Sequence, residues 1–278
     1  MCELCVKHGE GKKWYINAKN YNNDLLSDIK RKKIIKNFFH WADETYNKYF
    51  NLLKRLPFDK PLIGVSLKTI IRMLFINNHW GQVVPIEDVE RIISMTNSIT
   101  RIPCVCRKIT KGKEVRTCFL ISFDVKNAGM AEIIDQSFFG GPDVAKFEKV
   151  DNTNAINFMR NQERNGLFHS IWTFKTPFIG AICNCDRSGC IALKMYQEAA
   201  PIFFKAEYIV KIDKDMCAGC RECITVCPFG ALKYDTINKK AVADREKCHG
   251  CGICRSACKE NALRLTDSAK GVSPQNYG

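Results

Sequence analysis

Apolar residues recur at steps of three or four along the first part of the chain. Over residues 24–56 this spacing predicts an amphipathic helix, and Pro57 and Pro61 should end it because proline breaks the hydrogen bonds of a helix interior. A second helix is predicted over residues 66–77, with a break at Gly81. Such stripes are typical of scaffold helices that pack on a core, although membrane binding by the first helix is an alternative.

A third helix is predicted to begin at Pro85, since proline is favoured in the first turn of a helix. It should run to Met95, with Val89, Ile92 and Ile93 facing inward. The first hundred residues are therefore expected to be mostly helical.

The pattern changes to strands and loops after residue 100. Residues 101–107 and 115–125 are rich in β-branched and aromatic side chains, which predicts strands. Residues 151–165 have helical spacing, and Gly166 stands at the expected end of that helix. Further elements are expected in this order: strands over 167–174 and 178–183, a helix over 188–198 and a strand over 202–212.

Eight of the sixteen cysteines form two identical runs near the C-terminus. Each run has the spacing C-x2-C-x2-C-x3-C, and all four offsets between the runs are 31 residues. The flanks repeat as well, because Asp213 and Asp244 each precede the first cysteine of a run by four residues. The region is therefore an internal duplication, with the runs Cys217, Cys220, Cys223, Cys227 and Cys248, Cys251, Cys254, Cys258.

This segment resembles a bacterial two-cluster ferredoxin, and the resemblance implies two [4Fe–4S] clusters whose fourth ligands are exchanged between the runs. One cluster would be held by Cys217, Cys220, Cys223 and Cys258, and the other by Cys248, Cys251, Cys254 and Cys227. The two repeats differ at the residue after the fourth cysteine, which is Pro228 in the first repeat and Lys259 in the second. A zinc site or a disulfide framework is less favoured, because duplicated zinc sites rarely use so compact a run.

An α+β fold is expected for the 278 residues, of which 46% are apolar and can bury a sizeable core. We expect a mostly helical region and a cysteine-rich α+β region within one front domain, then a ferredoxin-like dicluster domain and a short tail. These parts are predicted to span residues 1–100, 101–204, 205–270 and 271–278.

The start of the chain has no apolar signal segment, and no run approaches about 18 uncharged apolar residues. We therefore expect a soluble, cytoplasmic protein whose cysteines are reduced and bind metal. Clusters of this kind are oxygen-sensitive as a class, which favours an anaerobic host.

The formal net charge of +14 falls to about +10 when two clusters of about 2− each are counted. The basic excess lies upstream of the ferredoxin-like segment, notably at residues 30–33 and Lys36. Such a face attracts an acidic redox partner, a phosphate-bearing substrate, RNA or a membrane surface, unless it is only the solvated face of a helix.

A second group of cysteines lies in the middle of the chain. It contains two C-x-C pairs, and in an extended segment residues i and i+2 project from the same face. Two such pairs would offer four soft ligands, enough for a further metal centre, with an iron–sulfur cluster favoured over zinc. The alternative is buried, metal-free thiols. The pairs are Cys104/Cys106 and Cys183/Cys185, with Cys118 and Cys190 as additional candidates.

The stretches 103–107, 118–120, 163–166 and 182–185 resemble a family of iron–sulfur proteins from anaerobes. In that family, P-C-x-C-R and C-N-C segments precede a two-cluster ferredoxin. In many relatives a denser cysteine run follows C-N-C, whereas here residues 186–189 separate Cys185 from Cys190. The resemblance implies bound iron and sulfur but no defined reaction.

Several other residues are candidates for chemistry. Cys2 and Cys5 form a C-x2-C pair that is a reactive dithiol, half of a composite metal site or simply unused. His169 is the best candidate for a proton donor or a fourth ligand, and Glu163 lies near it in sequence. Lys175, Asp186 and Arg187 are candidates for contact with an anionic small-molecule substrate.

Three functions remain open. In the favoured one, the ferredoxin-like domain relays low-potential electrons to a metal or substrate site in the front domain, as in a reductase or a reductase component. The second is a non-catalytic carrier that docks on an enzyme complex. The third is a redox-responsive nucleic-acid binder, the least favoured because no recognisable reading unit is present. Whether the protein is an iron–sulfur oxidoreductase stays open. The sequence contains no nucleotide-binding motif, so nucleotide-driven chemistry is not indicated.

Overall fold

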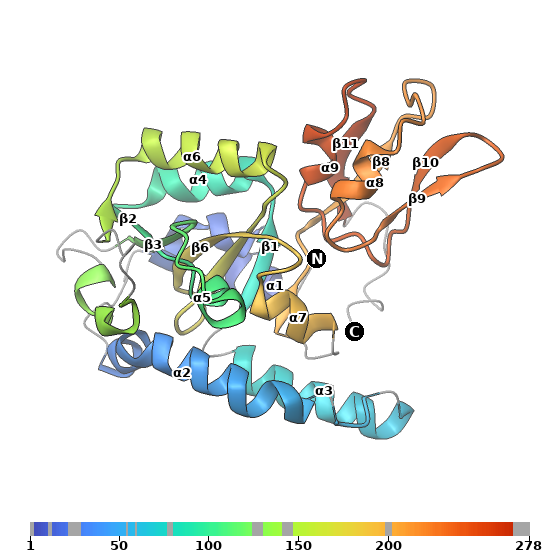
Figure 1. The fold of residues 1–278 in the computed structure, drawn as a ribbon. Coiled ribbons are helices and arrows are strands. Elements are labelled where there is room, and N and C mark those ends of the chain that lie inside the picture. Colours follow the sequence, from blue (N-terminus) through green and yellow to red (C-terminus); the bar gives the residue numbers. More distant parts are fainter. Residues whose placement is uncertain are drawn as a thin grey trace.

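A computed structural model describes residues 3–10, 13–21, 29–53, 55–58, 60–76, 80–123, 130–140, 147–197 and 202–268. Its front part is built on a mixed sheet, to which a smaller C-terminal unit is attached (Figure 1). The fold is α+β, as predicted. Within the described residues no helix has the length and apolar character needed to cross a membrane.

The described part of the front sheet has seven strands in the order β4-β2-β3-β6-β5-β1-β7. Neighbouring strands are antiparallel, except that β1 and β7 are parallel. Strands from both of the predicted front regions therefore lie in one sheet. Their bounds are Gly81–Val84 (β1), Ser98–Ile102 (β2), Cys118–Ser122 (β3), Glu148–Lys149 (β4), Phe168–Thr173 (β5), Ile179–Cys185 (β6) and Phe203–Phe204 (β7).

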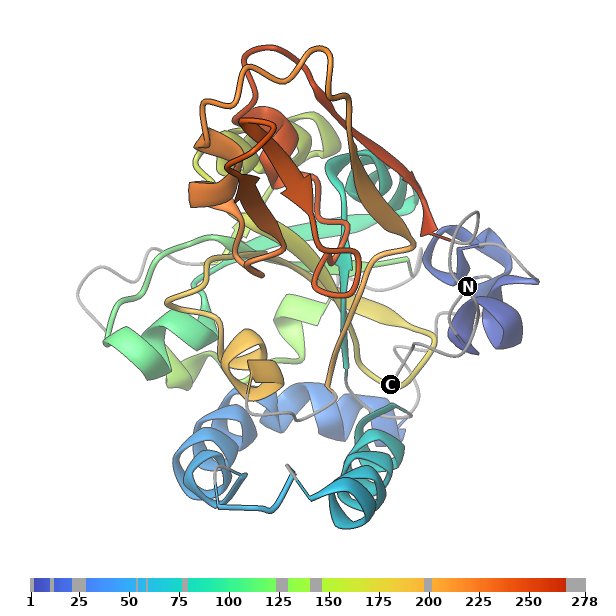
Figure 2. The same ribbon diagram turned by 90° about the vertical axis from the view of Figure 1, so that its right-hand side faces the viewer.

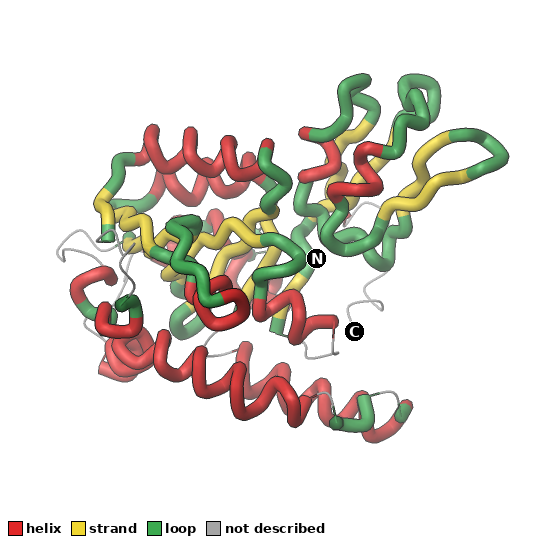
Figure 3. Tube along the Cα trace, viewed as in Figure 1, coloured by secondary structure: helices red, strands yellow, loops and turns green. Residues whose placement is uncertain are grey.

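Helices cover both faces of this sheet (Figures 1 and 3). One face packs against α4 (Ile86–Met95) and α6 (Asn152–Arg164), and Val89, Ile92 and Ile93 are buried there as predicted. The opposite face packs against α2 (Ile29–Leu53), α5 (Val105–Lys111) and α7 (Ile191–Gln197). Because strand side chains alternate between faces, each strand contributes to both cores.

Shorter elements complete the front part. Figure 2 shows α3 (Pro61–Ile76) beside α2 on the outer side of the molecule. The N-terminal elements are α1 (Glu3–Gly9), η1 (Trp14–Ile16) and η2 (Ala18–Tyr21), and buried Trp14 packs against Trp80. Two further 3-10 turns are η3 (Met130–Glu132) and η4 (Gln136–Phe138).

The C-terminal unit has little regular structure (Figure 3). Two antiparallel pairs of strands and two short helices surround a separate core that contains several of the cysteines. The elements are β8 (Tyr208–Ile212), α8 (Glu222–Val226), β9 (Leu232–Asp235), β10 (Lys240–Ala243), α9 (Ile253–Ser256) and β11 (Leu263–Asp267).

Several predicted elements differ from those in the structure. Helix α3 begins at Pro61 and not at residue 66, because a proline needs no hydrogen-bond partner at the first helical position. The predicted break at Gly81 is the start of β1. The predicted 188–198 helix starts only at Ile191, and the predicted 202–212 strand is split into β7 and β8. Parts of these predictions lie outside the described residues: 24–28, 77, 124–125, 198 and the tail at 271–278.

The prediction of a strand over residues 101–107 was wrong in its second half. Strand β2 ends at Ile102, because Pro103 has no N–H to donate to a neighbouring strand. The N–H of Cys104 instead donates to the carbonyl of Val115 at 2.8 Å, and α5 begins at Val105. The first C-x-C pair therefore lies at the start of a helix.

Candidate functional site

The middle cysteines form a closed ring on the α2 face of the sheet. Each thiol interacts with two other thiols of the same group, so that six side chains from four separate segments enclose one space. We call this group the six-thiol ring, and its order is Cys104, Cys106, Cys190, Cys185, Cys183, Cys118 and back to Cys104.

Regular backbone structure positions half of the ring. Cys118 of β3 and Cys183 of β6 are directly opposite each other in the antiparallel register. Cys185 lies two residues further along β6, so its side chain projects from the same face. The predicted extended arrangement of the second C-x-C pair is confirmed.

Two helix starts supply the other half. Cys104 immediately precedes α5 and Cys106 lies in its first turn. Cys190 precedes α7, where its sulfur accepts a hydrogen bond from the N–H of Leu193 at 3.4 Å. Cys190 therefore joins the ring although residues 186–189 separate it from Cys185.

Thiol–thiol hydrogen bonds lower the pKa of the cysteines at two opposite positions of the ring. Hydrogen bonds from the thiols of Cys106 and Cys118 lower the pKa of Cys104 well below its usual value. Hydrogen bonds from Cys183 and Cys190 likewise lower the pKa of Cys185 to about 7. The pKa values of the four flanking thiols are raised, because they donate to these sulfurs or are buried.

Arg107 holds a positive charge beside the ring, and the sequence analysis did not single it out. Its guanidinium donates to Asp186 Oδ2 at 3.0 and 2.6 Å, to Thr117 Oγ1 at 2.5 Å and to the carbonyl of Asn184 at 3.1 Å. This fork joins α5 to the segment after β6. Asp186, a candidate for contact with an anionic substrate, is thus paired within the protein.

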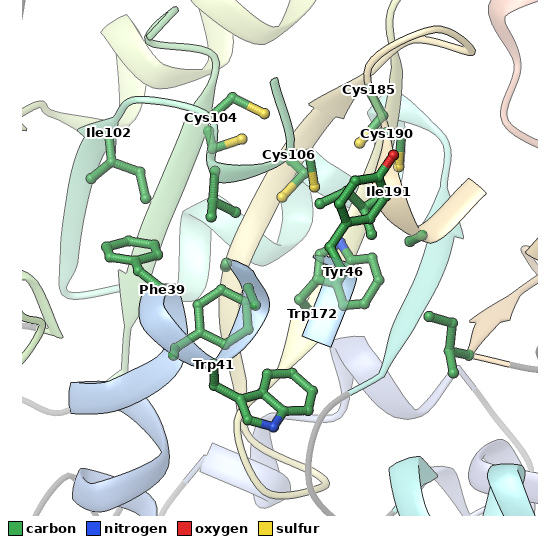
Figure 4. A pocket seen from close by; sticks show the side chains of 18 of the residues that line it. Phe39, Trp41, Tyr46, Ile102, Cys104, Cys106, Trp172, Cys185, Cys190 and Ile191 are labelled. Carbon is green, nitrogen blue, oxygen red and sulfur yellow. The ribbon is translucent and has the colours of Figure 1, made fainter. Parts of the chain in front are cut away.

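One side of the ring borders a cavity of about 110 Å³. Figure 4 shows sulfur atoms of the ring on one side of this space and aromatic rings on another. The aromatic wall includes Phe39, Trp41 and Tyr46 from α2, and Trp172 from β5.

The two C-terminal cysteine runs form two further groups of four. Cys223 lies near Cys217, Cys220 and the distant Cys258, and burial with these thiols raises the pKa of Cys223 to about 11. We call these four residues the first set. Cys220 is its exposed member.

The second set has the complementary composition. Cys254 lies near Cys248 and Cys227, and Cys251 also neighbours all three of these residues. Burial and these neighbours raise the pKa of Cys254 to about 12. Each run therefore contributes three cysteines to one set and its fourth cysteine to the other.

The repeated aspartates shape the loop before each run. Asp213 Oδ1 accepts the N–H groups of residues 215 and 216, and Asp244 Oδ1 accepts those of residues 246 and 247. The carbonyls of the same aspartates accept the N–H groups of Cys217 and Cys248. The flanking repeat noted in the sequence thus fixes the position of each first cysteine.

The turn after the fourth cysteine forms in both repeats. The N–H of Gly230 donates to the carbonyl of Cys227, and the N–H of Asn261 donates to that of Cys258. Both turn residues have positive φ, 63° and 51°. Lys259 can therefore replace the proline without changing the turn.

Both sets suit iron–sulfur cores by their donor chemistry, because four thiolates can each bind one iron of a cubane. Within the described residues no three His, Cys, Asp or Glu side chains converge closely enough to hold a single metal ion. Residues 209–259 match the family model of the 4Fe–4S dicluster domain. The C-terminal unit is a ferredoxin-type dicluster domain. Among curated proteins, none matches the chain.

Aromatic side chains connect the dicluster domain to the six-thiol ring. Phe229, which follows Cys227 and Pro228, stacks on His249 with ring centroids 3.9 Å apart. Phe229 also packs against Phe168 of β5, at a ring-centroid distance of 5.1 Å. Phe168 in turn lies directly opposite Cys185 in the β5–β6 register. We call Phe229, His249 and Phe168 the aromatic bridge.

Packing and ion pairs hold the dicluster domain in this position. Cys251 and Ile253 belong to the same hydrophobic core as four ring cysteines. Arg255 of α9 forms a two-pronged ion pair with Glu87 of α4, at 2.6 and 3.0 Å. The hydroxyl of Tyr208 donates to Asp88 at 3.0 Å.

His169 and Glu163 lie away from the ring. His169 is fully buried on the opposite face of the sheet, with Nδ1 2.7 Å from Asn184 Oδ1, and its Nε2 has no hydrogen-bond partner. Glu163 is buried on α6 and hydrogen-bonds Ser256 of the dicluster domain. Neither contacts the cavity beside the ring.

Cys5 belongs neither to the six-thiol ring nor to the two C-terminal sets. It is buried against the N-terminal elements, and its thiol donates to Glu207 Oε1 at 3.3 Å. Cys2 lies outside the described residues.

The sequence analysis missed the residues that lie between the cysteine groups. Phe229 follows a cluster-binding motif and His249 stands inside one, so their positions in the runs could have indicated an interface. Phe168 had no comparable signal. Its role depends on strand register, which the sequence does not specify.

Proposed function

We propose that this protein is an iron–sulfur electron-transfer protein whose dicluster domain delivers electrons to a metal centre in the front domain. The first and second sets would hold one [4Fe–4S] cluster each, and the six-thiol ring would hold a further multi-iron core. Bound iron–sulfur cores supply low-potential, one-electron chemistry.

The observation that carries this proposal is the aromatic bridge. It links the second set to the ring: His249 stacks on Phe229, Phe229 packs on Phe168, and Phe168 lies opposite Cys185 in the strand register. Packed side chains favour electron transfer, because electronic coupling falls steeply across gaps.

The exposure of the cysteines supports a direction for this transfer. The first set has one exposed cysteine, Cys220, whereas the second set has none, since its members are buried or half-buried. Electrons from a redox partner would therefore enter at the first set and leave from the second. The front centre is the end of the route, which fits a reductase or a component of one better than a simple carrier.

The choice of a cluster over zinc for the ring rests on its geometry. Six thiols surround one space, more than the four that a tetrahedral zinc ion uses. Thiolate-rich sites of this kind favour iron–sulfur chemistry.

The test is the metal content of protein purified under strict exclusion of oxygen. The dicluster domain alone accounts for about eight iron and eight sulfide per chain. A value clearly above eight, with an additional species in the electron paramagnetic resonance (EPR) spectrum on reduction, supports the proposal. Eight iron with one zinc, or eight iron alone, contradicts it.

A further inference from the structure

We propose that the cavity beside the six-thiol ring binds a small, uncharged and largely apolar molecule next to the thiols. This inference rests on the proposed function, since the ring would then be the centre that such a molecule meets. It adds the chemical class of the ligand.

The cavity extends well beyond the thiols. Cys185, Cys183 and Ala181 all line it, and these alternate residues project from one face of β6. At about 3.3 Å per residue, this row covers about 13 Å. The thiols occupy one part of the row, and the other end is lined by Ala181, Phe174 and Ile202. The cavity therefore has an apolar end beyond the thiols.

The walls of the cavity select against charge. Apart from the six cysteines, its lining residues are aromatic or aliphatic, and none of them carries a charge. The indole N–H of Trp172 is already used, because it donates to Ser170 Oγ at 3.0 Å. An ion would lose its hydration without a compensating partner. The anionic substrate considered from the sequence does not fit this space.

Helix α2 provides the route into the cavity. Trp41 lines the cavity, yet 43% of its surface is exposed to solvent. Ala42 lies beside it and also lines the cavity, so the wall is thin at this point. A small molecule can thus reach the ring from the outer side of α2, opposite the helices α4 and α6.

Xenon provides a test that does not depend on activity, because it binds dry apolar cavities. Crystals of the metal-loaded protein under xenon pressure should show an anomalous peak at the Ala181 end of the cavity. Ala42→Trp should abolish the peak by filling the space from α2, and Ala181→Leu should do so from the sheet. Asn47→Trp, on α2 but outside the lining, should leave it unchanged. Absence of the peak in the unmodified protein overturns the inference.

A second experiment tests the preference for uncharged ligands. Butyl isocyanide and azide both bind iron, but at neutral pH the isocyanide is uncharged and azide is an anion. With the reduced protein, the isocyanide should change the EPR signal assigned to the front centre and azide should not. Ala42→Trp should weaken the isocyanide effect by at least about tenfold, because the added ring occupies its space. Equal responses to both probes would overturn the inference.

The two proposals fail in different ways. If iron stays at about eight per chain while the xenon peak is present, the proposed front centre is wrong and the apolar cavity stands. If iron exceeds eight and xenon finds no site, the centre stands and the ligand class is wrong.

Discussion

The ring of Phe229 lies almost parallel to the imidazole of His249, with an angle of 5° between the two planes. Phe229 follows the first cysteine run and His249 lies within the second, so the two halves of the duplication meet at this contact. The stack faces the front domain through Phe168. It is the shortest ring-to-ring contact of the aromatic bridge.

The first prediction concerns this bridge. Phe229→Leu keeps an apolar side chain but removes the ring, so electron transfer from the dicluster domain to the front centre should slow severalfold. Loss of the aromatic pairs should cost about 1 kcal/mol of folding stability. Rapid photoreduction under anaerobic conditions would measure the rate. Phe204→Leu is the control. Phe204 lies outside the bridge, and its ring packs on Trp80 with the ring centroids 4.7 Å apart. Equal rates in both variants would show that the bridge has no role in transfer.

The second prediction assigns the extra iron to the ring. Cys118→Ser removes one ring thiol and should reduce the iron content towards about eight per chain. The dicluster signals should stay, because Cys118 lies outside both sets. Cys5→Ser should leave the metal content unchanged, since Cys5 donates to Glu207 and is not a member of the ring. Metal analysis and EPR of the two variants test this assignment. If both variants lose the same amount of iron, the ring does not hold the additional iron.

The third prediction concerns a glycine between two cysteines of the first run. Gly219 has φ = 71°, and a Cβ there would lie 2.2 Å from the carbonyl oxygen of Lys239. Gly219→Ala should therefore destabilise the domain by more than about 2 kcal/mol and impair assembly of the first cluster. Gly230→Ala is the matched control, because Gly230 also has positive φ, 63°, but a Cβ there meets nothing within 4 Å. It should cost only about 1 kcal/mol. Thermal unfolding and iron content would test both, and equal losses would contradict the steric argument.

The fourth prediction is a pH dependence of stability caused by His169. Burial lowers the pKa of this histidine to about 4, although Asn184, Glu87 and Glu90 act in the opposite direction. The unfolded chain therefore takes up a proton near pH 6.5 that the folded protein does not bind, and stability falls as the pH drops below that value. Between pH 7 and pH 5 this loss should be about 2 kcal/mol.

The variant His169→Gln isolates this contribution, because glutamine does not titrate. Chemical unfolding at pH 7 and pH 5 should show a smaller decrease for the variant than for the parent protein. Parallel decreases would mean that the histidine does not stay neutral when buried.

The parts of the fold that could be predicted are those with strong local signals. The helix after Pro85 buries the three predicted residues Val89, Ile92 and Ile93, and the helix before Gly166 is capped by Asp151, whose side chain accepts the N–H of Asn154. The cysteine runs were equally clear, because their spacing is itself the constraint. In these segments the local sequence and the tertiary structure favour the same conformation.

The remaining features depend on contacts between distant segments. Cys104 begins a helix because its N–H is bound by Val115, and Cys190 joins the ring from a loop that Arg107 and Asp186 hold in place. Successive side chains of a strand point to opposite faces of the sheet. Ser170 lies on the same face as Cys185, so its neighbour His169 points away from the thiols. The sequence indicated which cysteines were unusual, but not that six of them would close into one ring.

The exchange of fourth cysteines has a consequence for the order of assembly. Cys258 lies with the first run, 41 residues after Cys217 along the chain. A nascent chain that has not yet exposed Cys258 lacks one member of the first set, although its first three cysteines are already available. Both runs must therefore leave the ribosome before the first set is complete, so the N-terminal half of the duplication cannot mature ahead of the C-terminal half.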